Sequence, residues 1–153
     1  MSTTDELYQQ VILDYNKSPR NYRHMDDPTH HATGLNPLCG DAYDVFLKVG
    51  EDGVIEDVSF EGQGCAISKA SASLMTQEIK GKTVEEAKAL FESFHALLVQ
   101  QDTPEDVRTG LGKLRVFAGV WRYPARVKCA ALAWHALETA IKGGETVSTE
   151  DTM

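Results

Sequence analysis

Apolar residues near the start of the chain recur at helical spacing, so that they fall on one face of a helix. These residues are Leu7, Tyr8, Val11, Ile12 and Tyr15. Ser18-Pro19 follows them, and proline cannot continue a helix. The pattern predicts a helix over residues 5–17. It is followed by a loop over residues 21–38 with at most a short edge strand near residues 31–35.

Two segments with strand-forming residues come next. Residues 42–49 and 54–60 are rich in valine, isoleucine and aromatic side chains, which favour strands. Between them lies Gly50-Glu51-Asp52-Gly53, where either glycine can adopt the positive φ of a tight turn. We expect a β-hairpin whose second strand is broken at Gly62-Gln63-Gly64.

The second half of the chain has helical signals. Small residues after Cys65 predict a helix over residues 66–79, which Gly81 ends. Thr83 and Glu86 have the spacing of a capping box, which predicts another helix to about residue 99.

Two prolines suggest the remaining helices. Pro104 is suited to the first turn of a short helix, and Pro124 to the start of a final helix over residues 125–142. The order of elements is helix, small antiparallel sheet, then a run of helices. This segregation predicts an α+β fold with an antiparallel sheet of about three strands packed against several helices.

The chain has 153 residues, a length that fits one domain. We expect a single domain over residues 1–153, with an ordered core over about 5–142 and a frayed tail over 145–153.

Charge and hydropathy exclude several classes of protein. The net charge of −8 disfavours phosphate backbones and anionic membrane surfaces, so we expect neither a nucleic-acid nor a membrane partner. No apolar run approaches the roughly 18 residues of a membrane helix. The polar N-terminus from Met1 to Glu6 lacks the features of a signal peptide. We therefore expect a cytoplasmic protein, in which three cysteines are suited to metal binding or thiol chemistry rather than to disulfides.

Each of the three cysteines lies at a predicted boundary. Cys39 precedes the first hairpin strand, Cys65 follows the second, and Cys129 lies near the start of the last helix. The start of one hairpin strand lies beside the end of its partner, so Cys39 and Cys65 are expected to be neighbours. A helix N-terminus favours a thiolate, and Arg126 and Lys128 add positive charge near Cys129.

The residue types alone leave two interpretations open. Three thiolates and one further ligand complete a tetrahedral zinc site, and Asp41 is only two residues from Cys39. Free cysteines also occur as small buried hydrophobic residues. Arg126 and Lys128 are also consistent with ordinary charged residues on a helix surface. Five histidines compete with Asp41 for the fourth position. They are His24, His30, His31, His95 and His135.

Three separated motifs resemble the NifU/IscU/SufU superfamily of iron–sulfur assembly proteins. They are Asn36-Pro37-Leu38-Cys39-Gly40-Asp41, the segment 60–73 around Gly64-Cys65-Ala66, and Tyr123-Pro124-Ala125-Arg126-Val127-Lys128-Cys129-Ala130. The N-terminal segment 7–15 fits as well, and the resemblance spans about residues 5–142.

Two features make the chain similar to the SufU type within this superfamily. IscU-type scaffolds carry a histidine immediately before the third cysteine, where this chain has Lys128. The segment of about residues 100–122, between the middle helix and the last one, is also longer than in those scaffolds.

The resemblance implies a zinc-dependent sulfurtransferase that accepts persulfide sulfur from a cysteine desulfurase of the SufS type and passes it to a downstream iron–sulfur scaffold. By motif position, Cys39, Asp41, Cys65 and Cys129 would be the zinc ligands. The catalytic residues would be Cys39 as sulfur acceptor, Asp41 as the ligand that a partner histidine replaces, and Arg126 and Lys128 as stabilisers of the freed thiolate.

Three alternatives remain at this point. The same residues would serve a scaffold that holds iron or a transient iron–sulfur cluster. A purely structural zinc is the second alternative. A zinc hydrolase is the third, although it requires an open coordination position and a general base, and the sequence has no HExxH pattern.

Overall fold

The computed structural model describes residues 3–101 and 103–149. Its helices are α1 (Thr3–Lys17), α2 (Ala66–Ile79), α3 (Val84–Val99), α4 (Glu105–Gly110) and α5 (Pro124–Ile141), with short 3-10 helices η1 (Gly112–Phe117) and η2 (Val120–Arg122). Its strands are β1 (His30–Asn36), β2 (Asp41–Val49), β3 (Ile55–Gln63) and β4 (Thr146–Ser148).

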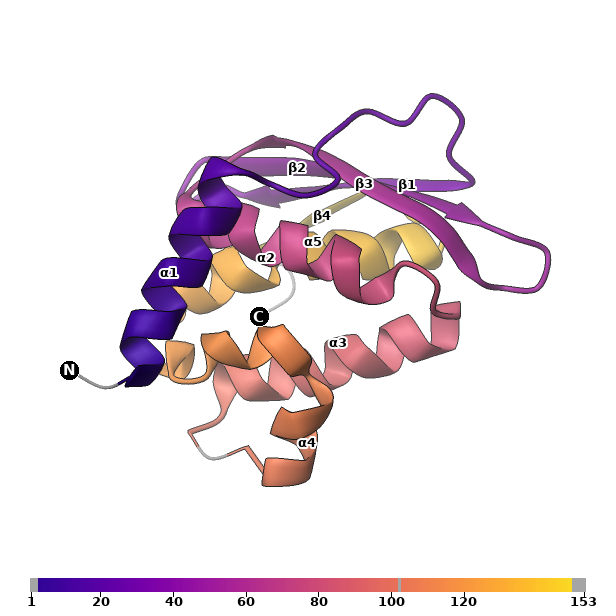
Figure 1. Ribbon diagram of the computed structural model, residues 1–153. Helices are drawn as coiled ribbons and strands as arrows, with labels where there is room; N and C mark the ends of the chain where they lie inside the picture. The colour runs from indigo at the N-terminus through magenta and orange to yellow at the C-terminus, as the bar shows by residue number, and fades with distance from the viewer. Residues whose placement is uncertain (1–2, 102, 150–153) are drawn as a thin grey trace.

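The elements are arranged in layers (Figure 1). The sheet forms one side, α2 and α5 pack against its inner face, and α3 with α4 lies beyond them. Helix α1 packs against α2. Because α5 lies between the sheet and α3, nearly all of its side chains from Val127 to Leu137 are buried. Its N-terminal half therefore occupies a fixed position below the sheet.

The sheet has the strand order β3-β2-β1-β4. Strands β1, β2 and β3 are antiparallel neighbours, and β4 runs parallel to β1. The last residue of β1, Asn36, is paired with the first residue of β2, Asp41. The turn between them carries Cys39, and the end of β3 leads to Cys65 at the same edge. The topology thus brings Cys39, Asp41 and Cys65 to one end of the sheet.

Close packing fixes α5 against β1. A Cβ atom at Gly34 would lie 3.1 Å from the Leu132 side chain and 3.2 Å from that of Ala136. Such distances are tighter than ordinary van der Waals contact. Glycine at this position therefore lets the helix approach the strand closely, and Cys129 on α5 is brought near the β1–β2 turn.

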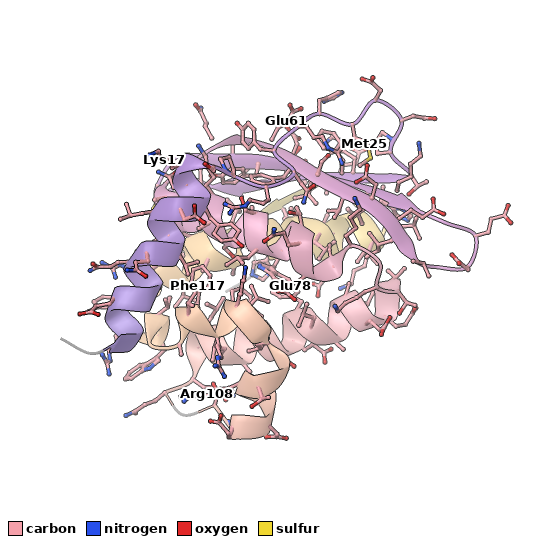
Figure 2. The ribbon with its side chains drawn as sticks, in the orientation of Figure 1. Lys17, Met25, Glu61, Glu78, Arg108 and Phe117 are labelled. Carbon is pink, nitrogen blue, oxygen red and sulfur yellow. The ribbon has the colours of Figure 1, made fainter. Side chains whose placement is uncertain are left out.

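The opposite face of the sheet is covered by the segment that follows α1. Met25 is buried there, and the rings of His31 and Phe46 are stacked with centroids 4.6 Å apart. Figure 2 shows Met25 and Glu61 on this side of the sheet, away from the helices, with Phe117 and Arg108 among the outer helices. This segment buries Phe46, whereas His31 and Asp44 on the same face stay 44% and 38% exposed, so the outer face is covered only in part.

Most of the predicted elements are confirmed. The α+β fold is present, α2 has its predicted bounds, and α3 begins with the capping box of Thr83 and Glu86. The hairpin forms between β2 and β3. The predicted strand near residues 31–35 is longer than expected, and it is not an edge strand because β4 flanks it.

The predicted strand break at Gly62 is wrong, because β3 continues to Gln63. Gly62 pairs with Tyr43 and has a φ of +138°. A Cβ atom there would lie only 2.1 Å from the carbonyl oxygen of Ala42. Glycine therefore allows the strands to approach at this point instead of separating them.

The tail differs from the frayed segment that the sequence predicts. Residues Thr146–Ser148 form β4, and Thr149 is buried. The rest of the predicted tail, residues 150–153, lies outside the described residues. In the part of the chain that the structure covers, no helix has the length and apolar character needed to cross a membrane.

Candidate metal centre

The three cysteines and Asp41 come together from three separate parts of the chain. Ligand atoms of Cys39, Asp41 and Cys129 all lie within 4.8 Å of one another. The Cys65 sulfur lies 3.9 Å from the Oδ2 atom of Asp41. All four predicted metal ligands are therefore in one cluster at the end of the sheet.

A tight turn after β1 positions Cys39. The backbone N–H groups of Cys39 and Gly40 both donate to the carbonyl oxygen of Asn36, at 3.2 and 2.9 Å. Gly40 has a φ of +74°, a conformation that glycine adopts without strain. The turn leaves Cys39 exposed, whereas Asp41 is only 3% and Cys129 only 5% exposed. Among these three candidate ligands, Cys39 is therefore the one that a partner protein can reach.

Asp41 is held by the loop that leads into α2. Its Oδ1 atom accepts a hydrogen bond from the backbone N–H of Cys65, at 3.1 Å. A buried carboxylate is stable only with such partners. Asp41 and Cys65 are consequently fixed relative to each other before any ligand or partner binds.

Cys65 is the N-cap residue of α2. Its sulfur accepts from the backbone N–H of Ser68 at 3.4 Å, and the Ser68 hydroxyl lies 3.6 Å away and donates to the Cys65 carbonyl. The hydroxyl groups of Ser68 and Tyr43 are 3.0 Å apart. A serine and a tyrosine from the interior therefore support Cys65 from behind.

In the metal-free protein, Cys65 and Cys129 shift each other's pKa. The neighbouring Cys129 thiol, together with the Ser68 N–H, lowers the pKa of Cys65 to about 6 despite burial. The nearby Cys65 sulfur and the burial of Cys129 raise the pKa of Cys129. Cys65 is therefore the thiolate of the pair near neutral pH, and Cys129 the thiol.

The donor set fits zinc. Zinc–sulfur bonds of about 2.3 Å at tetrahedral angles separate two sulfur ligands by about 3.8 Å, and the sulfurs of Cys39 and Cys129 lie 3.8 Å apart. Three sulfurs with one carboxylate oxygen give the four ligands that zinc takes. No histidine in the described ranges belongs to the group. His24 is hydrogen-bonded to Glu61, and His31 to Asp44.

Arg126 and Lys128 lie at the start of α5, before Cys129. The Arg126 guanidinium is 4.4 Å from the centre of the Tyr123 ring. Burial raises the pKa of Tyr8, and the positive charge of Arg126 opposes that rise. Arg126 also lines a hollow of about 390 Å³ together with residues of α1 and with Ile67. Arg126 is exposed, and Lys128 is half-buried next to Cys129.

Three supporting residues were not identified from the sequence. Asn36 and Ser68 lie within two of the three motif segments and Tyr43 lies within a predicted strand, but the sequence predicts no role for them at the centre. The position of Ser68, three residues after the N-cap Cys65, was an available signal, because the N3 backbone N–H is the usual donor to a capping side chain. Asn36 and Tyr43 carried no such local signal.

The sequence matches the profile of the NifU-like N terminal domain over residues 7–143. It is 42% identical to the zinc-dependent sulfurtransferase SufU of Bacillus subtilis (strain 168), over 90% of each chain. It is 41% identical to the iron-sulfur cluster assembly scaffold protein IscU of Streptococcus pyogenes serotype M1, over 93% of this chain and 87% of that protein.

Solved structures agree with this match. The crystal structure of FiSufU from Fervidobacterium islandicum AW-1 superimposes with a TM-score of 0.80 at 34% identity, over 89% of this chain and 97% of that one. The N-terminal part of a nitrogen-fixing NifU-like protein from Brucella abortus gives a TM-score of 0.79 at 26% identity, over 99% of this chain and all of that one, 100%.

Proposed function

The chain belongs to the family of NifU-like N-terminal domains, and from this membership we propose that it is a zinc-dependent sulfurtransferase serving iron–sulfur cluster assembly. It accepts persulfide sulfur from a cysteine desulfurase of the SufS type, in the cytoplasm, and passes it to a downstream scaffold. It acts through a single domain that spans the chain.

The observation that carries this proposal is the contrast in exposure within one four-residue cluster. Cys39 is exposed on a turn, while Asp41 and Cys129 are buried beside it. A sulfur acceptor must be reached by a partner's persulfide, whereas ligands that only hold a metal are better protected from solvent. Cys39 therefore has the exposure expected of the sulfur acceptor. Asp41, Cys65 and Cys129 have positions suited to residues that only bind the metal.

Sulfur transfer is a nucleophilic exchange that balances without a further reagent. The Cys39 thiolate attacks the outer sulfur of the partner's Cys–S–SH group. The bond between that sulfur and the partner's Sγ breaks, and the partner leaves as a thiolate while Cys39 becomes the persulfide. Bound zinc would supply the positive charge that keeps the sulfur ligands deprotonated.

The chain's own residues prepare this step. The two hydrogen bonds to the Asn36 carbonyl orient the turn, so that Cys39 is presented outward. Arg126 and Lys128 provide positive charge near the thiolate that forms when Cys39 is free, which favours the charged nucleophile. Asp41 is the one oxygen ligand of the set, and therefore the one a nitrogen ligand from a partner displaces most readily.

A scaffold function is the second candidate, because relatives of similar identity are named iron-sulfur cluster assembly scaffold proteins. The same four donors would then hold iron or a transient cluster. Two features favour sulfur transfer. Lys128 stands immediately before Cys129, where IscU-type scaffolds have histidine, and the connection to α5 is extended by α4, η1 and η2.

The test combines metal analysis with the location of the transferred sulfur. We expect the purified protein to contain one zinc per chain and to be colourless. After incubation with the desulfurase and cysteine, non-reducing peptide mass spectrometry should find an additional sulfur atom on Cys39. If the wild-type protein increases the turnover rate of the desulfurase, Cys39→Ser should abolish that increase, because a serine hydroxyl is a far weaker nucleophile at sulfur.

Leu38→Ala is the matched control, since Leu38 is the exposed neighbour of Cys39 on the same turn. It should keep both the zinc and the persulfide. Sulfur found only on Cys65 or Cys129 would contradict the choice of acceptor. A brown, iron-loaded protein without transfer activity would establish the scaffold function instead.

A further inference from the structure

Asn36 is a buried residue that contacts three parts of the metal centre. Its carbonyl oxygen accepts from the Cys39 and Gly40 N–H groups, and it is the strand partner of Asp41. Its side-chain Nδ2 atom donates to the Cys129 sulfur at 3.7 Å. The orientation of Asn36 thus affects the Cys39 turn and the buried Cys129 sulfur together.

The C-terminal segment reaches the same residue. Strand β4 pairs with β1 in parallel, beginning with the hydrogen bond from the Thr33 N–H to the Glu145 carbonyl at 2.8 Å. This pairing places Thr149, only 1% exposed, at the end of β1. The Thr149 hydroxyl donates to the Oδ1 atom of Asn36 at 3.2 Å.

We propose that Thr149 is a positioning residue for the metal centre, acting through Asn36 on Cys129 and on the Cys39 turn. This inference rests on the proposed function, because it takes Cys129 and Cys39 as the working sulfurs. It extends the centre to a segment beyond residues 7–143, over which the family profile matches.

The physical reason is the polarity of the two hydrogen bonds. The Cys129 sulfur accepts from the NH₂ group of Asn36, and as a zinc-bound thiolate it could only accept, so the NH₂ group must face this sulfur and the Oδ1 atom must face away. Oδ1 is then a buried acceptor, and leaving it without a hydrogen-bond donor destabilises this arrangement of the amide. The Thr149 hydroxyl supplies that donor and thereby holds the amide in the orientation that serves the thiolate.

Three variants distinguish the effect of the Thr149 hydroxyl from the effect of its packing and from a general effect of changing the β4 segment. Thr149→Val removes the hydroxyl at nearly constant shape, and Thr149→Ser restores it. Thr146→Val makes the same replacement at an exposed position of β4, three residues earlier. The first readout is zinc release to a chromophoric chelator, measured with zinc as the only metal. The second is the NMR resonance of the Asn36 side-chain amide in the metal-free protein.

We expect Thr149→Val to release zinc about fivefold more readily, the size of one lost hydrogen bond near a ligand. Its Asn36 amide resonance should shift, while Thr149→Ser and Thr146→Val should behave like the wild type in both measurements. The proposal is overturned if Thr149→Val matches the wild type, or if Thr149→Ser is impaired equally, which would indicate packing alone. If the wild type holds no zinc, the proposed function fails, whereas the amide resonance still decides whether Thr149 orients Asn36.

Discussion

Replacing Gly64 by alanine tests how tightly the loop before Cys65 is packed against the metal centre. A Cβ atom at this position would lie 2.6 Å from the Ser68 hydroxyl, 2.6 Å from the Tyr43 hydroxyl and 2.8 Å from the Oδ1 atom of Asp41. Carbon and oxygen atoms that are not bonded require more than about 3 Å. All three of these side chains are buried, so none can move away into solvent.

The expected loss of stability follows from these contacts. Overpacking of a dense interior destabilises a protein by about 1 to 3 kcal/mol. Moving the three oxygens also weakens the Tyr43–Ser68 hydrogen bond and the one from the Cys65 N–H to Asp41, each of which contributes about 1 kcal/mol. We therefore expect Gly64→Ala to lower the free energy of unfolding by about 2 to 4 kcal/mol, which lowers the melting temperature of a chain this size by about 5 to 15 °C.

The assay is thermal unfolding of the zinc-loaded and metal-free forms, together with the zinc content. Gly64→Ala should lose stability in both forms and should also retain less zinc, because Asp41 and Cys65 are displaced. Gly110→Ala is the matched control. A Cβ atom at Gly110 would meet nothing within 4 Å, so its melting temperature should stay close to that of the wild type. If Gly64→Ala unfolds and binds zinc like the wild type, the loop is not constrained by these contacts and the packing argument is wrong.

Two further predictions concern single titratable residues. Asp41→Ala should keep some zinc on three sulfurs but accept sulfur poorly, as assayed by desulfurase-coupled transfer. Wild-type transfer with a longer-lived reconstituted cluster would favour the scaffold function. For His135, burial and His95 lower the pKa from 6.5 to about 4, and Glu138 opposes them. The unfolded chain therefore binds this proton first as the pH falls from 6.5, and the free energy of unfolding should decrease by about 1.4 kcal/mol per pH unit down to about pH 4. His135→Gln should lack this component in urea titrations at pH 7 and pH 5, and equal decreases in both proteins would refute it.

Local sequence signals determined most of the elements. The capping box of Thr83 and Glu86 is a short-range interaction, so it could be recognised from spacing alone. Small residues after Cys65 and the hairpin glycines were similarly informative, because propensity and turn geometry act within a few residues.

Gly62 and the tail show where such signals fail. Glycine in a strand allows either a break or a close approach, and only the position of the neighbouring Ala42 carbonyl decides between them. Strand β4 is only three residues long, so local propensity does not specify which strand it pairs with. Its parallel pairing with β1 depends on where α5 ends relative to the sheet, which is a property of the packed fold.

For the candidate site, too, some features could be predicted from the sequence and others depended on the folded structure. The resemblance to the family implied Cys39, Asp41 and the other two cysteines as a group, whereas the residue types alone left Asp41 and five histidines as candidates for the fourth ligand. Which of them is exposed depends on the Asn36 turn and on the close approach of α5 at Gly34. The motifs in the sequence therefore supplied the candidate donor atoms. Only the tertiary structure, through contacts between residues about 90 to 113 positions apart, decided that Cys39 faces outward and that Asn36 and Thr149 support the buried sulfur.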